Sequence, residues 1–115
     1  MLIPSDTLPY FDNMIYLPML LTILSNDREI VENGSYKIKG PYLKLIDQAI
    51  DRVQIEIKTT QDYMRSNKLK LIKGKTEDTF TTYIFVYHGR EDQRRYLNAR
   101  LKNRTEELLE YFLGI

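Results

Sequence analysis

The sequence contains no cysteine and no tryptophan, and it has a single histidine among its 115 residues. Without cysteine the chain cannot form disulfides, thiolate metal sites or a cysteine nucleophile, and the absence fits a reducing cytoplasm. The lone His88 has no serine in a recognisable nucleophile context to accompany it, so we do not expect it to act as a general base. The sequence also lacks a glycine-rich phosphate loop and a His/Asp/Glu cluster at metal-ligand spacing. We therefore predict no catalytic residue, no metal, no cofactor and no enzymatic activity.

Long hydrophobic runs are missing as well. The most apolar segment, residues 14–24, covers 11 residues and contains Pro18. A membrane-spanning helix needs roughly 20 apolar residues. The N-terminus shows no basic region followed by an apolar run, so it does not have the pattern of a signal peptide. We expect a soluble cytoplasmic protein that does not contact a membrane.

The composition is that of one globular domain. Hydrophobic residues make up 43% of the chain and charged residues 29%, and 115 residues are too few to divide into two stable cores. Pro4 and Pro9 lie close together near the N-terminus. We therefore predict a flexible arm over residues 1–10 and a single domain over residues 11–115.

The net charge of +1 conceals an uneven distribution. Residues 1–57 carry 5 basic and 8 acidic side chains, residues 58–104 carry 12 and 5, and residues 105–115 carry 0 and 3. These segments therefore have net charges of −3, +7 and −3. A segment at +7 can attract anionic partners even when the whole protein is nearly neutral.

Helical periodicity appears in the first two thirds of the chain. Apolar residues at helical spacing predict a helix over residues 12–25, with Pro18 either kinking it or opening it. A short helix over residues 27–32 is expected to end at Asn33-Gly34 through a left-handed residue. A long helix over residues 41–67 follows, because apolar positions recur there every three or four residues without glycine or an internal proline.

The last third favours a β-hairpin and a final helix. Residues 68–73 alternate lysine and apolar residues at first, residues 74–78 form a turn, and residues 79–87 are rich in β-branched and aromatic residues. The last helical region is predicted to begin between residues 90 and 98 and to reach about residue 113. The resulting fold class is α+β, mostly helical, in the order helix, short helix, long helix, β-hairpin, helix, an outline that resembles a winged helix.

Basic side chains gather on and after this hairpin. Lysines on an exposed wing can contact phosphates without reading sequence, so these residues are candidates for nucleic-acid binding. They can equally keep an exposed sheet edge soluble and unpaired. The hypothesis of a binding or regulatory protein gains if the six side chains share one face of the structure. They are Lys68, Lys70, Lys73, Lys75, Arg94 and Arg95.

The second predicted strand is apolar on both faces, which calls for cover from a helix on one face and from a partner or a further strand on the other. Tyr83, Phe85 and Tyr87 are therefore candidate interface residues. With the long helix, this feature favours the alternative of a homodimeric protein-interaction or structural module that does not bind nucleic acid. We expect a homodimer, with nucleic acid or another protein as the further candidate partner.

Several short strings in the chain resemble a known bacterial family. They are similar to those of the small uncharacterised YhjD-like proteins of Bacillus and related Firmicutes, over most of the chain from residue 14. The resemblance implies a bacterial cytoplasmic protein, and it brings no known activity and no catalytic residue. The strings are Tyr16-Leu17-Pro18-Met19, Pro41-Tyr42-Leu43, Tyr63-Met64-Arg65, Thr79-Phe80-Thr81 and Arg95-Tyr96-Leu97-Asn98.

Overall fold

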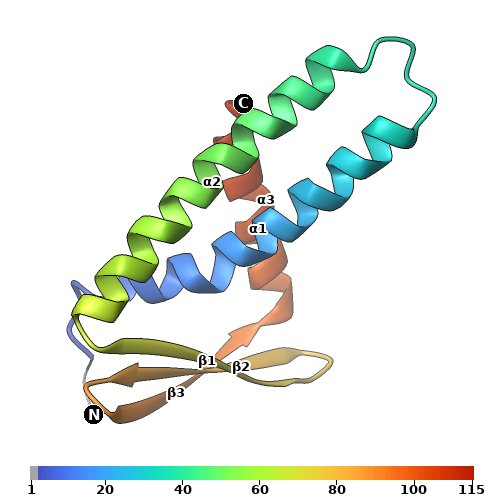
Figure 1. Cartoon of the computed structure of the whole chain (residues 1–115). Coiled ribbons are helices and arrows are strands. Elements are labelled where there is room, and N and C mark those ends of the chain that lie inside the picture. The colour runs from blue at the N-terminus through green and yellow to red at the C-terminus, as the bar shows by residue number, and fades with distance from the viewer. Residues whose placement is uncertain (1–2) are drawn as a thin grey trace.

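The computed structural model describes residues 3–115 as three α-helices and one three-stranded antiparallel sheet (Figure 1). The predicted helix-rich α+β class is confirmed. All three helices lie on the same side of the sheet, and α1 and α2 form a long hairpin that extends away from it (Figure 1). The elements are α1 Leu8–Asn33, α2 Gly40–Ser66, β1 Leu69–Thr76, β2 Phe80–Tyr87, β3 Arg90–Leu97 and α3 Asn98–Leu113.

The N-terminal residues are more ordered than predicted. Ile3 and Thr7 are buried, and the Thr7 hydroxyl donates to the carbonyl of Pro4 at 2.7 Å. The ring of Tyr10 stacks on Tyr63 with centroids 3.6 Å apart. Residues 3–10 of the predicted arm thus make contacts with the rest of the domain, while residues 1–2 lie outside the described part.

Helix α1 is a single helix, which corrects the prediction of two. Residues 25–27 look like a capping sequence, yet the helix continues because Leu24 and Val31 on either side of them are buried in one cluster with α2 residues. Packing of this apolar face outweighs the local capping preference. The helix ends where predicted, although Gly34 has an extended backbone with φ −84° and ψ −177° rather than a left-handed one.

Pro18 lies inside α1, and the helix bends in this region (Figure 1). Proline cannot donate the hydrogen bond that closes the preceding turn, which is the usual cause of such a kink. The bend allows the first half of α1 to cover the sheet while the second half runs beside α2.

The third strand, β3, replaces the predicted start of the last helix. Between β2 and β3, His88 and Gly89 have φ of 50° and 81°. Positive φ at both central residues is typical of the two-residue turns that join hairpin strands. Tyr87 pairs with Arg90, and the antiparallel register continues to Phe80 and Leu97. The sequence of β3 is polar on both faces, so no alternation of apolar and polar residues indicated a strand there.

Two clusters of buried side chains hold the helices and the sheet together. Near the sheet, Phe11 of α1 stacks on Phe85 of β2 with centroids 4.4 Å apart. The second cluster joins the three helices and includes Leu20, Val53 and Phe112. The predicted stripe of α2 is confirmed at its main positions, because the following side chains are buried: Ile46, Ala49, Val53, Thr60 and Met64.

Candidate interaction surfaces

The six predicted cationic residues lie on opposite edges of the sheet. The strand order is β1-β2-β3, so the lysines of β1 and the arginines of β3 are separated by β2. Strand β1 contains Lys70, Lys73 and, near its end, Lys75, and Lys68 directly precedes this strand. All four lysines are exposed. Arg94 and Arg95 lie on the far strand.

The same residues also divide between the two faces of the sheet. Side chains that are paired across neighbouring strands share a face. Lys73 and Arg94 both pair with Tyr83, which is buried beneath the helices, so they belong to the helix-facing side. Lys70 and Arg95 belong to the opposite face, where the Arg95 guanidinium lies 4.1 Å from the centroid of the Phe80 ring. The six cations therefore form no single surface.

The predicted interface aromatics belong largely to the core of the chain itself. Tyr83 is 5% exposed and Phe85 1% exposed, because α1 covers this face of β2. Tyr87 is half-buried and stacks on His88. The cover that the sequence required for this face therefore comes from α1, and Tyr83 and Phe85 leave almost no surface for a partner.

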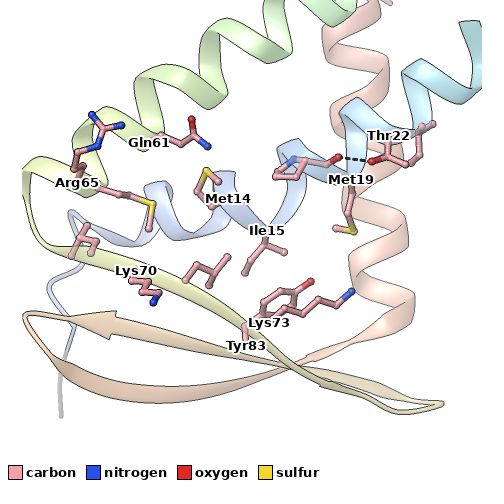
Figure 2. A pocket seen from close by; sticks show the side chains of 14 residues that line it. Met14, Ile15, Met19, Thr22, Gln61, Arg65, Lys70, Lys73 and Tyr83 are labelled. Atoms are coloured by element: carbon pink, nitrogen blue, oxygen red, sulfur yellow. Dashed lines mark hydrogen bonds between the residues drawn. The ribbon is translucent and has the colours of Figure 1, made fainter.

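A groove of about 1070 Å³ runs between α1, α2 and β1 (Figure 2). Met14, Met19 and Met64 contribute to its apolar lining. Methionine is flexible and polarisable, so it adapts readily to apolar groups of different shape. The charged side chains that line the groove are all basic: Arg65, Lys70 and Lys73.

A second hollow, of about 1000 Å³, lies between α1, β3 and α3 and has two acidic and four basic side chains. At one wall, the Tyr96 hydroxyl donates to the Asp12 carboxylate at 3.2 Å. Asp12 keeps an exposed side, but partial burial of its carboxylate against the neighbouring elements raises its pKa, which the Tyr96 hydrogen bond and the nearby arginines only partly oppose. Burial, together with the Asp12 charge, also raises the pKa of Tyr96.

The raised pKa of Asp12 predicts a particular pH dependence of stability. The folded protein binds the proton of the Asp12 carboxyl group more tightly than the unfolded chain does. The contribution of Asp12 to the free energy of unfolding is therefore favourable below its ordinary pKa, and it is lost as pH rises through the raised pKa. We expect wild type to lose stability relative to Asp12→Asn as pH rises from acid to neutral. Urea unfolding of both proteins across this range measures the difference. The opposite slope would show that the arginines outweigh the burial.

The far end of the α1–α2 hairpin carries large apolar side chains in water. We name the distal patch by its five residues, whose exposed fractions are 63% for Ile30, 47% for Tyr36, 66% for Ile38, 53% for Tyr42 and 41% for Leu45. Four of them, all except Ile38, line one hollow of about 380 Å³ between the helix ends.

The connector of the hairpin holds part of the distal patch in place. The Tyr36 and Tyr42 rings contact each other with centroids 5.5 Å apart. A Cβ at Gly34 would lie 2.8 Å from the carbonyl oxygen of Ile30 and 3.2 Å from the Tyr36 ring, so only glycine permits this close approach. The presence of Tyr36 and Ile38 in a polar loop was the signal available in the sequence.

Within residues 3–115, no group of three His, Asp or Glu side chains is placed to hold a metal ion. In the same part of the chain, no helix combines the length and apolar character needed to cross a bilayer.

Comparison with known proteins places the chain in a family. The family model described as YhjD protein matches residues 2–115. The chain belongs to the YhjD family. A relative from Bacillus subtilis (strain 168), described as uncharacterized protein YhjD, is 31% identical over 102 residues, which cover 89% of this chain and 85% of the relative. The predicted family resemblance is thereby confirmed. No solved structure shows a significant match.

Proposed function

We propose that this protein is a non-enzymatic protein-interaction module of the bacterial cytoplasm that works as a homodimer joined through the distal patch. The observation that carries the proposal is the exposure of five large apolar side chains at one end of the molecule. Soluble monomers seldom leave such side chains together in water, because their burial is favourable.

The distal patch supplies more than half of the area that a standard protein interface needs. If a large apolar side chain presents roughly 200 Å² when fully exposed, five side chains exposed by 41–66% present about 500 Å². A standard interface buries roughly 800 Å² on each partner. With a polar rim around it, the distal patch approaches that size, so we expect a dimer with a dissociation constant in the micromolar range.

The charges beside the distal patch suit a second copy of the same chain. Residues 27–33, at the end of α1, carry three acidic side chains and one basic, whereas residues 36–45 carry three lysines and no acidic side chain. In a two-fold symmetric dimer, the same surface of both copies forms the interface, and the two surfaces run in opposite directions. The acidic end of α1 then meets the basic start of α2 from the other copy, and this pairing occurs twice.

Sedimentation equilibrium tests the proposed dimer. We expect wild type to associate reversibly between about 1 μM and about 1 mM, and Ile38→Asp to raise the dissociation constant at least about tenfold, because it places a carboxylate in the apolar contact. The matched control is Ile55→Asp. Ile55 is also 66% exposed but lies 13 residues beyond Tyr42 along α2, roughly 20 Å away.

Two results would overturn the dimer. One is a wild-type protein that stays monomeric over the whole concentration range. The other is an Ile55→Asp variant that weakens association as much as Ile38→Asp does.

Nucleic-acid binding through the six cations is the alternative proposal, and it has less support. A surface that follows phosphates needs its positive charges together. Here the lysines of β1 and the arginines of β3 occupy opposite edges of the sheet, and Arg94 is paired with Asp92 at 3.0 Å. The resemblance to a winged helix also has less support, because the predicted short helix over residues 27–32 is not separate but forms the end of α1.

A further inference from the structure

Among residues 3–115, β1 pairs only with β2 and so has one edge without a neighbouring strand, and the groove between α1, α2 and β1 lies beside that edge. The amide of His88 donates to the carbonyl of Lys68 at 3.2 Å. In an antiparallel ladder, alternate residues direct their backbone groups to opposite sides. Lys68, Lys70 and Ile72 therefore bond to β2, whereas the backbone groups of Leu69, Leu71 and Lys73 point away from the sheet.

The same three residues send their side chains toward the groove. Leu69, Leu71 and Lys73 pair with Tyr87, Phe85 and Tyr83 and so share the helix-facing side of the sheet, and all three line the groove. Outward backbone groups and groove-lining side chains thus belong to the same residues. A strand added at this edge would satisfy the backbone groups and fill the groove in one step.

The charges of the groove select the sequence of such a strand. Arg65, Lys70 and Lys73 line it, and no carboxylate does (Figure 2). Within residues 3–115, neither Lys70 nor Lys73 lies within 4 Å of a carboxylate, whereas Arg65 is paired with Asp62 at 3.3 Å. Lysines on an edge strand repel basic strands, and they disfavour pairing with neutral strands because their charges would lose contact with water. An acidic strand is attracted by the same side chains.

We propose that this groove and the free edge of β1 bind an extended segment of a partner protein in which apolar residues alternate with acidic ones. The apolar side chains enter the methionine-lined groove beside Leu69 and Leu71, and the acidic side chains, which alternate to the opposite face of the strand, lie beside Lys70. An amphipathic helix would fill the groove but would leave the backbone groups of Leu69 and Leu71 without partners. The site lies at the sheet end of the molecule, away from the distal patch (Figure 1), so the inference is independent of the proposed dimer.

A labelled peptide about nine residues long, the length of a typical strand, with alternating leucine and glutamate tests the site. Fluorescence anisotropy measures its binding to the full chain. The same peptide with lysine in place of glutamate is the charge control. Two further peptides carry N-methyl groups, one on every leucine amide and the other on every glutamate amide. Since only one set of amides can face β1, we expect one methylated peptide to lose binding and the other to keep it.

Protein variants locate the contact. We expect Lys70→Glu to weaken binding of the glutamate peptide about tenfold and to strengthen binding of the lysine peptide, whereas Lys102→Glu on α3 leaves both unchanged. On binding, the amides of Leu69 and Leu71 should become protected from hydrogen exchange.

Several outcomes would overturn the inference. The first is no binding of the glutamate peptide at about 1 mM, a concentration at which even weak complexes form. The second is equal binding of the glutamate and lysine peptides. The others are equal effects of both methylation patterns and equal losses of binding from Lys70→Glu and Lys102→Glu.

Discussion

Replacing Phe11 with alanine is expected to lower the free energy of unfolding by about 3–5 kcal/mol. The Phe11 ring is fully buried and stacks on Phe85, which is 1% exposed. Alanine would remove the ring and leave a cavity between α1 and the sheet. Because domains of this size are stable by only about 5–15 kcal/mol, this single change removes a large part of the total.

Urea unfolding followed by circular dichroism measures the effect of Phe11→Ala. The control is Ile55→Ala, at a side chain that is 66% exposed, where the expected change is within about 0.5 kcal/mol. If Phe11→Ala cost no more than the control, α1 would not be packed on the sheet through this pair of rings.

Asn98→Ala is expected to be the next most damaging of the changes considered, at about 2–3 kcal/mol, because it removes three hydrogen bonds of roughly 1 kcal/mol each. The Asn98 amide donates to the carbonyls of Glu77 at 2.7 Å and Asp78 at 3.1 Å. Its side-chain oxygen accepts from the Thr81 hydroxyl at 2.6 Å. The hydrogen bonds of this one side chain therefore connect the start of α3 to the β1–β2 turn and to β2.

The matched control for Asn98→Ala is Asn67→Ala. The Asn67 side chain makes one exposed bond, to the carbonyl of Tyr63 at 2.8 Å. Chemical denaturation should show a clearly smaller loss for Asn67→Ala, of about 1 kcal/mol or less. Hydrogen exchange adds a local measurement, since amides in the β1–β2 turn should exchange faster in Asn98→Ala. Equal losses from both variants would contradict the role assigned to Asn98.

The helices were the most predictable part of the fold, although their number was not. The stripe of α2 could be found because buried positions such as Ala49 and Val53 recur at helical spacing. The split of α1 was wrong because residues 25–27 carry a local capping preference, and only contact with α2 overrides it. A sequence shows the preference but not the neighbour that outweighs it.

Strand β3 could not be found by periodicity. Its helix-facing residues Asp92 and Arg94 are polar and neutralise each other at 3.0 Å, so an apolar alternation never arises. The His88-Gly89 turn was the remaining signal, and its positive φ values became evident only in the folded chain.

The candidate surfaces were predicted only in part. Lysines on an edge strand could be recognised from the sequence, but their separation from Arg94 and Arg95 depends on β2 lying between them. Tyr83 and Phe85 were predicted as interface residues because their strand is apolar on both faces, and only the packing shows that α1 covers them. The distal patch was missed because the exposure of Ile30 and Tyr42 depends on where α3 ends relative to the hairpin.

By itself, the sequence determined the α+β class, the apolar face of α2, the basic character of β1 and the exclusion of cysteine chemistry. These follow from residue type and spacing, which act over a few neighbouring positions. Only the tertiary structure decided that α1 is continuous, that the basic residues occupy two edges, and that the distal patch and the groove are open. Those features depend on which segments far apart in the chain pack together, and the spacing of apolar residues within one segment does not show which segment it will contact.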